Sequence, residues 1–294
     1  MKNQPFSFDI YSKKIHENMS FFLNQLPNQD QELIQAIKYS CLNGGKHVRG
    51  TLVYLIAELF QVTSSNVDKI AISVELMHTY SLIHDDLPAM DDDDIRRGQP
   101  SNHIKFNQAT AILAGDALQA LSFEILTQLT IKPHHIIKLI ELLSNSVGTK
   151  GMCLGQSLDI LNENKTIALN ILKKIHQLKT GALFKSSILM GAIVSGDESK
   201  KYLNSLSHFG ETIGLFFQIQ DDILDITSTT DELGKPQGSD QKISKCTFPS
   251  LLGLDEAIVY ANELQEKCLF LINQLPGNKE KLIHLIKILS KRKK

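Results

Sequence analysis

Two clusters of aspartates, far apart in the sequence, are the residues best suited to chemistry. The first cluster reads DDLPAMDDDDIRRG from Asp85 to Gly98, and the second reads QDDILD from Gln220 to Asp225. Carboxylates crowded in this way repel one another unless cations neutralise them. Mg²⁺ takes oxygen ligands and commonly shares its coordination shell with substrate phosphates. The two clusters therefore predict a magnesium site that handles a phosphorylated substrate.

The second cluster lies within an apolar helical pattern. Asp221 and Asp225 are four residues apart in the stretch IGLFFQIQDDILDI, so a helix places both carboxylates on one face. Charged side chains in such a stretch are rarely buried without a partner. An acidic run such as Asp91–Asp94, seen alone, is typical of a solvated loop. The presence of two clusters makes a metal site the better interpretation.

The first cluster contains a helix-breaking residue. On an unbroken helix Asp85 and Asp91 would lie on different faces, because each residue turns the chain by about 100°. Pro88 lies between them and lacks the N–H group that a helix interior needs. We therefore predict that the helix ends or kinks near Leu87, and that the chain turns to bring Asp91 back toward Asp85.

Bulk properties exclude several classes of protein. The chain has 294 residues, of which 42% are hydrophobic, and its formal net charge is −1. A nucleic-acid-binding protein would show a basic face, so we expect no nucleic-acid partner. The sequence shows no run of about 20 apolar residues and no signal peptide, and we predict no membrane span. The 4 cysteines are scattered, which fits a reducing compartment, and we expect a cytoplasmic protein.

Arginine is used sparingly and close to the motifs. Only four of the 31 basic residues are arginines, and three of these are Arg49, Arg96 and Arg97. A planar guanidinium binds a phosphate through two hydrogen bonds at once, which lysine cannot copy. This placement indicates phosphate recognition.

Apolar residues recur at helical spacing along almost the whole chain, whereas strands bounded by hairpin turns are not evident. We predict a single all-α domain over residues 1–294, a bundle of about ten or more helices around a deep central cavity. The polar segment from Thr227 to Lys245 carries Lys235 beside the second cluster and is predicted to be a mobile lid. The expected helices lie near 6–25, 29–43, 47–61, 66–87, 107–130, 133–149, 151–162, 167–195, 199–227, 250–274 and 278–291.

Further segments carry groups that could bind anions. GGKHVRG, from Gly44 to Gly50, combines glycines with Lys46 and Arg49 at an expected helix start, where backbone N–H groups favour an anion. HQLKTG places Lys179 and Thr180 within an expected helix. MCLGQSLD puts the amide of Gln156 and the carboxylate of Asp159 three residues apart on one helical face.

Taken in order, these motifs resemble those of the trans-prenyl diphosphate synthases, and most of all the bacterial farnesyl diphosphate type. The matching motifs are GGKxxR, DDxxxxD, GQxxD, KTG, FFQxQDD, DDxxD and LGK, and the resemblance covers roughly residues 5–294. It implies an all-α bundle that forms a homodimer. It also implies that isopentenyl diphosphate condenses with dimethylallyl or geranyl diphosphate, giving (2E,6E)-farnesyl diphosphate and diphosphate.

The resemblance implies a role for each motif residue. Several Mg²⁺ ions would be held, directly or through water, by Asp85, Asp91, Asp221 and Asp225. The allylic diphosphate would be bound by Arg96, Lys179 and Lys235. Isopentenyl diphosphate would be bound by Lys46, Arg49, His78 and Arg97. The site near the new bond would be lined by Thr180, Phe217 and Gln218, and the side chains that serve catalysis are Lys179, Thr180, Gln218 and Lys235.

Two residues depart from the family's usual GGKRxRP segment. His47 replaces an arginine and Gly50 replaces the proline, so we expect weaker positioning of isopentenyl diphosphate without loss of activity. We expect product length to depend on Tyr80, whose ring would block a growing chain about one helical turn from Asp85. Geranylgeranyl diphosphate synthases of related type share these features, so a longer product is an alternative.

Other functions compete with this interpretation. A class I terpene cyclase keeps the fold, but its second metal motif usually mixes Asn, Ser or Thr and Glu where this chain has DDILD. A phosphohydrolase of the HD type would use His84 and Asp85 as a pair of transition-metal ligands, and would need neither Asp91 nor Asp225. A catalytically inactive partner subunit is disfavoured because both aspartate motifs are intact.

Overall fold

The structure is a computed structural model that describes residues 8–227 and 246–291. Its contacts divide the chain into two compact units, and each is described by itself. The first unit comprises Met1–Tyr54 and Thr63–Ile140, and the second comprises Leu55–Val62 and Glu141–Lys294. The single domain and the central cavity stay predictions. Lys235, with nearly all of the predicted lid, lies outside the described residues.

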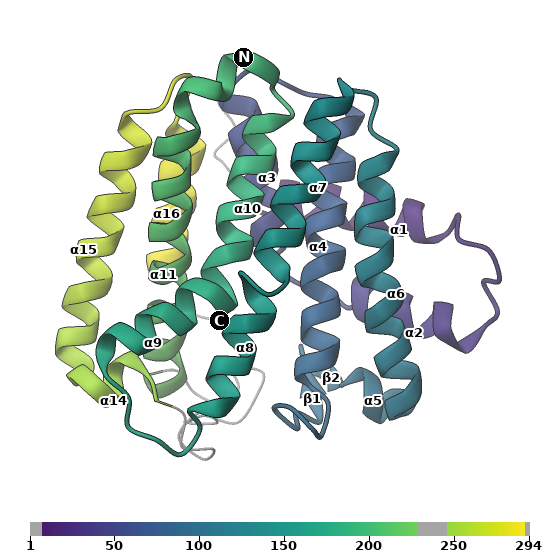
Figure 1. Cartoon of the computed structure of the whole chain (residues 1–294), viewed down its shortest axis with the longest axis horizontal. Coiled ribbons are helices and arrows are strands. Elements are labelled where there is room, and N and C mark those ends of the chain that lie inside the picture. Colours follow the sequence, from purple (N-terminus) through teal and green to yellow (C-terminus); the bar gives the residue numbers. More distant parts are fainter. Residues whose placement is uncertain (1–7, 228–245, 292–294) are drawn as a thin grey trace. The chain divides into compact units, whose positions relative to one another are not determined.

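The described residues are almost entirely helical, which confirms the all-α prediction (Figure 1). The first unit contains α1 (Phe8–Leu23), α2 (Glu32–Leu42), the start of α3 (Val48–Leu59), α4 (Ser65–Asp85), α5 (Asn102–Lys105), α6 (Gln108–Thr127) and the start of α7 (Pro133–Val147). The second unit contains the ends of α3 and α7, α8 (Met152–Leu161), α9 (Leu169–His176), η1 (Gln177–Gly181), α10 (Ala182–Ile193), η2 (Gly196–Tyr202), α11 (Leu203–Thr227), α14 (Phe248–Leu252), α15 (Leu254–Asn273) and α16 (Glu280–Lys291).

In the first unit, α4 packs along α6, and both α1 and α2 contact α4. Buried side chains occur on every face of α4, among them Ile70, Ala71 and Ile72, as expected for a helix that is apolar all round. The hydroxyl of Ser73 donates to the carbonyl oxygen of Ser122 on α6 at 2.7 Å, so a polar group inside this contact is satisfied. This packing holds the C-terminal end of α4, where the first aspartate cluster begins.

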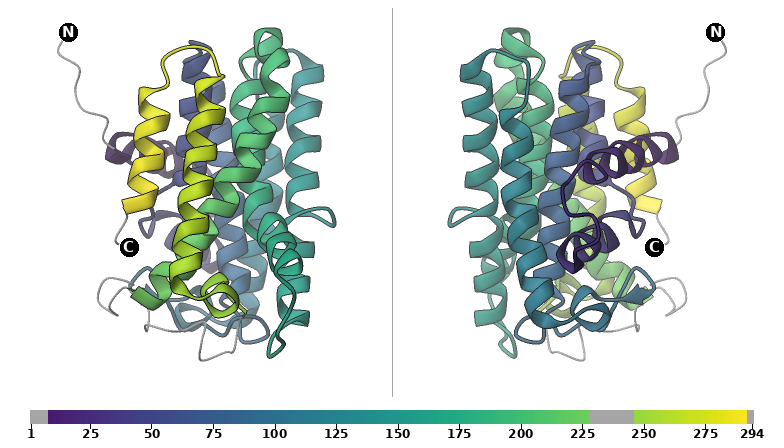
Figure 2. Two further views of the ribbon diagram at one scale, coloured as in Figure 1. Left: turned by 90° about the vertical axis from the view of Figure 1, so that its left-hand side faces the viewer. Right: turned by 90° about the vertical axis from the view of Figure 1, so that its right-hand side faces the viewer.

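In the second unit, α11 packs against α10, α15 and α16, and these helices run alongside one another (Figure 2). The buried side of α11 includes Phe209, Ile213, Phe216 and Ile219. Gly214 allows α11 to approach η1 closely, because a Cβ atom there would lie 2.5 Å from the Cα atom of Gly181. The glycine of the KTG motif therefore serves packing against the helix that carries the second aspartate cluster.

The helix boundaries differ from the prediction in several places. The helix expected over 167–195 consists of α9, the π-helical turn η1 and α10. The helix expected over 250–274 is interrupted at Gly253, whose φ of 85° ends α14 before α15 begins. A short antiparallel hairpin was not predicted: β1 (Ile95–Arg96) pairs with β2 (Gln99–Pro100). Strands of two residues are too short to show the alternating pattern by which strands are found in a sequence.

Among the described residues, α6 alone is long and apolar enough to cross a bilayer, with a mean hydropathy of 1.3 over its most apolar window. The sequence predicted a helix near 107–130 but no apolar run long enough to cross a bilayer. One such helix is weak evidence for a span, because core helices of soluble proteins pass the same test. Core helices of soluble proteins are mostly buried, whereas only 39% of that window is buried inside the structure. The absence of a membrane span therefore stays a prediction.

Candidate active site

The chain turns sharply after α4, and this turn brings the first aspartate cluster together. The helix ends at Asp85, two residues before the predicted position. The backbone N–H of Asp91 donates to the carbonyl oxygen of Asp85 at 2.8 Å, and that of Asp93 donates to the carbonyl oxygen of Asp86 at 3.2 Å. The predicted return of Asp91 toward Asp85 is therefore confirmed.

Arg96 is held in place by a carboxylate that sequence reasoning missed. Its Nε atom donates to Oδ1 of Asp86 at 2.9 Å, and its Nη2 atom donates to the same oxygen and to Oδ2 of Asp93, the latter at 3.1 Å. Burial opposes the charge on Arg96, but the two carboxylates outweigh it and raise the pKa of this guanidinium. Burial raises the pKa of Asp86, although Arg96 opposes that shift.

Arg97 occupies the turn of the β1–β2 hairpin and reaches the glycine-rich segment. Arg97 and Gly98 have φ angles of 55° and 72°, as the two central residues of a type I′ turn require. Nη1 of Arg97 donates to the carbonyl oxygen of Gly44 at 2.6 Å. A Cβ atom at Gly45 would lie 2.8 Å from Cζ of Arg97, so the second glycine leaves room for this guanidinium. Two motifs that are distant in sequence are thus joined within one unit.

Arg49 and His78 also meet, as the resemblance implies for two residues that bind one substrate. Nη1 of Arg49 lies 3.1 Å from Nε2 of His78. Burial and the neighbouring charges of Arg49 and Arg97 hold the pKa of His78 well below its ordinary value, so its ring is neutral and accepts the hydrogen bond. Burial lowers the pKa of Arg49 to about 10, which leaves it charged at neutral pH. Lys46, three residues before Arg49, is exposed.

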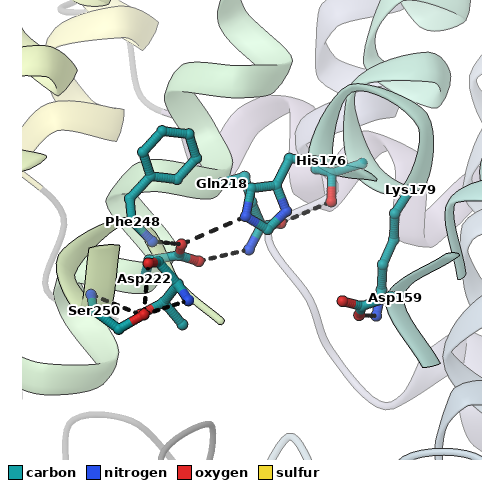
Figure 3. Close-up of polar contacts among 9 residues, drawn as sticks. Asp159, His176, Lys179, Gln218, Asp222, Phe248 and Ser250 are labelled. Carbon is teal, nitrogen blue, oxygen red and sulfur yellow. Dashed lines mark hydrogen bonds and ion pairs between the residues drawn. The ribbon is translucent and has the colours of Figure 1, made fainter. Parts of the chain in front are cut away.

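In the second unit, Lys179 lies in the π-helical turn and binds Asp159 of α8 (Figure 3). Its Nζ atom is 2.7 Å from Oδ2 of Asp159. A Cβ atom at Gly155 would lie 2.2 Å from the backbone nitrogen of Lys179, so this glycine permits the close approach of α8. The GQxxD and KTG motifs are therefore two sides of one contact. Single π-helical turns occur frequently at functional sites.

Thr180 and Gln218 belong to a chain of hydrogen bonds that ends at Phe248 (Figure 3). The hydroxyl of Thr180 donates to Oε1 of Gln218 at 2.7 Å, and Nε2 of Gln218 donates to Oδ1 of Asp222 at 3.0 Å. Oδ2 of Asp222 accepts from the backbone N–H of Phe248 at 3.0 Å and lies 3.6 Å from Nε2 of His176. Asp222 is buried and fixes the orientation of the Gln218 amide.

The remaining predicted residues of this unit lie on α11. Asp225 is buried and Asp221 is half-buried, one turn apart near the C-terminal end of the helix. The ring centroid of Phe217 is 4.8 Å from that of Phe184 on α10. The structure thus brings Thr180 and Gln218 into contact, and it places Phe217 on the same turn of α11 as Gln218.

The carboxylates present suit Mg²⁺. The turn after α4 gathers Asp85 and Asp91, and the helical spacing of four residues gathers Asp221 and Asp225. Each group offers only oxygen ligands, which a hard divalent cation prefers. The alternative of a His–Asp metal pair fits less well. Nε2 of His84 donates a hydrogen bond to the carbonyl oxygen of Ile112 on α6 at 3.0 Å, so this nitrogen is not available to a metal. That histidine serves packing between α4 and α6.

Sequence reasoning missed three buried carboxylates that orient other groups: Asp86, Asp222 and Glu75. Each is 2% exposed. Two of them adjoin predicted metal ligands in the sequence, where they were counted only as members of the clusters. Glu75 interrupts the apolar run AISVELM, and a charge in such a run could have signalled a buried partner.

The comparison with protein families decides the assignment. A family model described as polyprenyl synthetase matches residues 30–289. The chain belongs to the polyprenyl synthetase family. This membership confirms the resemblance that the motifs predicted, and the prenyltransferase assignment with it.

Two curated relatives and one solved structure show which members of the family the chain is similar to. This polyprenyl synthetase is 44% identical over 263 residues to a farnesyl diphosphate synthase of Escherichia coli, with 88% of each chain covered. It is 41% identical over 269 residues to a chloroplastic geranylgeranyl pyrophosphate synthase of Capsicum annuum, covering 90% of this chain and 73% of that one. It is also similar to a crystal structure of geranyltransferase from Helicobacter pylori complexed with magnesium and isoprenyl diphosphate. That match has a TM-score of 0.84 and 36% identity, and it covers 97% of this chain and 98% of the other.

Proposed function

We propose that this polyprenyl synthetase is a Mg²⁺-dependent farnesyl diphosphate synthase. It transfers the allylic group of dimethylallyl diphosphate, and then of geranyl diphosphate, to isopentenyl diphosphate. The allylic carbon–oxygen bond breaks, and diphosphate leaves with the bonding electron pair. The terminal alkene carbon of isopentenyl diphosphate then attacks the carbocation. One proton is lost to the liberated diphosphate, so the reaction needs no protein base.

The reaction requires fixed positive charge where the diphosphate departs, because preorganised charge stabilises a transition state most effectively. Arg96 and Lys179 supply it in this proposal. Asp86 orients the guanidinium of Arg96 and Asp159 orients the ammonium of Lys179, so neither side chain needs to reorganise during the reaction. Lys235 would bind the same diphosphate.

Isopentenyl diphosphate would be bound by a separate set of cations. The contact of Arg49 with the neutral ring of His78 supports this role, as does the placement of Arg97 against Gly44. Lys46 would complete the set. Thr180, Gln218 and Phe217 would line the region near the new bond, where the hydrogen bond between Thr180 and Gln218 fixes both side chains.

Asp85, Asp91, Asp221 and Asp225 would hold several Mg²⁺ ions. When bound, these ions would neutralise the negative charge that develops on the departing diphosphate. The single observation that carries the proposal is the turn after α4, which brings Asp91 to Asp85 and holds Arg96 beside them through Asp86. The proposed metal ligands and the proposed diphosphate-binding cation thus come from one short segment.

Two further features of the protein are proposed. A homodimer is supported by the large apolar side chains that α6 exposes, Ile112 at 44% and Leu113 at 56%. An interface between two copies of the chain would cover such side chains. We also propose a cytoplasmic location, which the scattered cysteines support.

Product analysis tests the function. The purified protein would be incubated with isopentenyl and dimethylallyl diphosphates, and the dephosphorylated products separated by chromatography. We expect farnesol as the main alcohol with Mg²⁺ and no product in excess chelator. Geranylgeraniol as the main product would establish the alternative suggested by the Capsicum relative. Cyclic hydrocarbons, or full turnover in chelator, would contradict the proposal.

A further inference from the structure

A buried carboxylate lies against the start of α3, where this chain departs from the family's usual GGKRxRP pattern. Oε2 of Glu75 is 3.0 Å from Nδ1 of His47, and Oε1 of Glu75 accepts the backbone N–H of Gly50 at 2.7 Å. The side chains of His47 and Glu75 are each only 3% exposed. The two unusual residues of the segment therefore bind the same carboxylate, one at each oxygen.

The number of hydrogen-bond donors explains why the two departures occur together. A buried carboxylate needs a donor for each oxygen, because water does not reach it. An arginine offers two parallel N–H groups and can satisfy both oxygens. An imidazole directs one N–H toward a carboxylate, so His47 leaves one oxygen of Glu75 without a donor. The N–H of Gly50 fills that place, and a proline there would have none.

The same contacts fix the backbone beside the proposed substrate-binding residues. His47 has a φ angle of 46°, a left-handed conformation that is uncommon for non-glycine residues. Glu75 holds the chain at His47 and again at Gly50, and Arg49 lies between these two points. Lys46 directly precedes the first of them. The orientation of the proposed isopentenyl diphosphate subsite thus depends on the carboxylate of Glu75.

We propose that Glu75 is a positioning residue for Lys46 and Arg49, and that His47 and Gly50 are a coupled replacement for arginine and proline. The two residues satisfy Glu75 only together. In this proposal the contacts of Glu75 compensate for the two replacements, so these contacts oppose the weaker positioning that the sequence predicts. The link to substrate rests on the proposed function, whereas the coupling rests on the contacts alone.

A double-mutant cycle tests the coupling. The variants are His47→Arg, Gly50→Pro and the two combined, with Gly50→Ala as the matched control. Alanine keeps the backbone N–H but adds the Cβ atom that would lie 2.8 Å from Cδ1 of Ile15 and 3.1 Å from Cγ of Glu75. Both variants add this Cβ atom, so the difference between Gly50→Pro and Gly50→Ala measures the lost donor together with the proline ring that replaces it.

We expect Gly50→Pro to lower the unfolding temperature by about 3–10 °C relative to Gly50→Ala. It should also raise KM for isopentenyl diphosphate roughly tenfold, with KM for the allylic substrate unchanged. Adding His47→Arg should recover most of both losses. Equal damage from alanine and proline, or no recovery in the double variant, overturns the coupling. If Gly50→Pro fails to fold, a folded double variant supports the proposal and an unfolded one contradicts it.

Glu75→Gln tests the positioning role separately. This variant keeps the shape of the side chain and should raise KM for isopentenyl diphosphate while kcat and the allylic KM stay near wild type. A lower unfolding temperature with an unchanged KM would make Glu75 a structural residue only and refute the positioning role. If the wild-type protein makes no prenyl product, the proposed function fails, while the unfolding temperatures of the cycle still decide the coupling.

Discussion

Removing the carboxylate of Asp86 should release Arg96 and weaken binding of the allylic diphosphate. In the structure Arg96 donates twice to Oδ1 of Asp86 and once to Asp93, and Asp86 is 2% exposed. Breaking a buried ion pair costs about 3–5 kcal/mol. The side chain of Arg96 is 31% exposed, so water can solvate part of the freed guanidinium. We therefore expect Asp86→Ala to cost about 3 kcal/mol, the lower end of that range.

Thermal unfolding and steady-state kinetics measure the two consequences. A loss of about 3 kcal/mol corresponds to a fall of about 6–12 °C in unfolding temperature for a large domain. KM for the allylic substrate should rise by about tenfold or more, because Arg96 no longer has a fixed orientation. KM for isopentenyl diphosphate should stay near wild type. Asp86→Asn keeps an acceptor oxygen but loses the charge, and should give intermediate effects.

The matched control for this prediction is Asp94→Ala. Asp94 lies in the same loop and its side chain is exposed, while its backbone carbonyl, which accepts from the N–H of Ser101 at 2.8 Å, is kept in the variant. The control removes one negative charge near the site without touching Arg96. An allylic KM that is the same in Asp86→Ala and Asp94→Ala would refute the view that Asp86 orients Arg96 for substrate.

Three further outcomes are expected. Arg96→Lys should mainly raise KM for the allylic substrate and Arg97→Lys mainly that for isopentenyl diphosphate, and identical effects in steady-state kinetics would contradict this division. Tyr80→Ala should shift products beyond farnesyl length, because a smaller side chain no longer blocks the growing tail. A stable, active variant with the same products by chromatography would exclude Tyr80 as the residue that limits product length. Burial would raise the pKa of Glu75, but the hydrogen bonds from His47 and Gly50 and the charge of Arg49 outweigh it and hold this pKa below its ordinary value of 4.5. Glu75 therefore stabilises the fold above that pH and loses this effect as the pH falls through its folded-state pKa. The stability difference between wild type and Glu75→Gln should shrink in acid, and a constant difference between neutral and acidic denaturant titrations would contradict it.

The sequence predicted the features that local chemistry determines. Pro88 made the turn after α4 predictable, since a proline cannot continue the helix, and helical spacing correctly placed Asp221 and Asp225 one turn apart. The all-α class followed from periodicity in the same way.

The sequence did not reveal features that depend on packing between distant segments. The sequence around Lys179 keeps the apolar spacing of an ordinary helix, so it gives no sign of the π-helical turn. In the structure this turn lies against Gly155 of α8. The hairpin at Arg97 has strands too short for a pattern, and its arginine reaches a glycine carbonyl far away in the sequence. The role of Asp86 depends on Arg96 in the hairpin, a partner that no spacing rule identifies. Asp222 lies four residues after Gln218 on α11, a helical spacing that could have indicated their hydrogen bond, whereas its contact with Phe248 depends on packing. The part of the chain that holds Lys235 lies outside the described residues, so its role stays a prediction.

The central claim is that both aspartate clusters serve one metal-dependent prenyl transfer, and the rate of that transfer in single-cluster variants tests it most directly. Asp85→Ala and Asp221→Ala would be assayed with geranyl and isopentenyl diphosphates at saturating Mg²⁺, with circular dichroism to confirm that each stays helical. We predict that each variant is slower than wild type by about 10²-fold or more, which corresponds to at least about 2.7 kcal/mol of transition-state stabilisation. A wild-type rate in either folded variant would remove that cluster from the mechanism and contradict the claim.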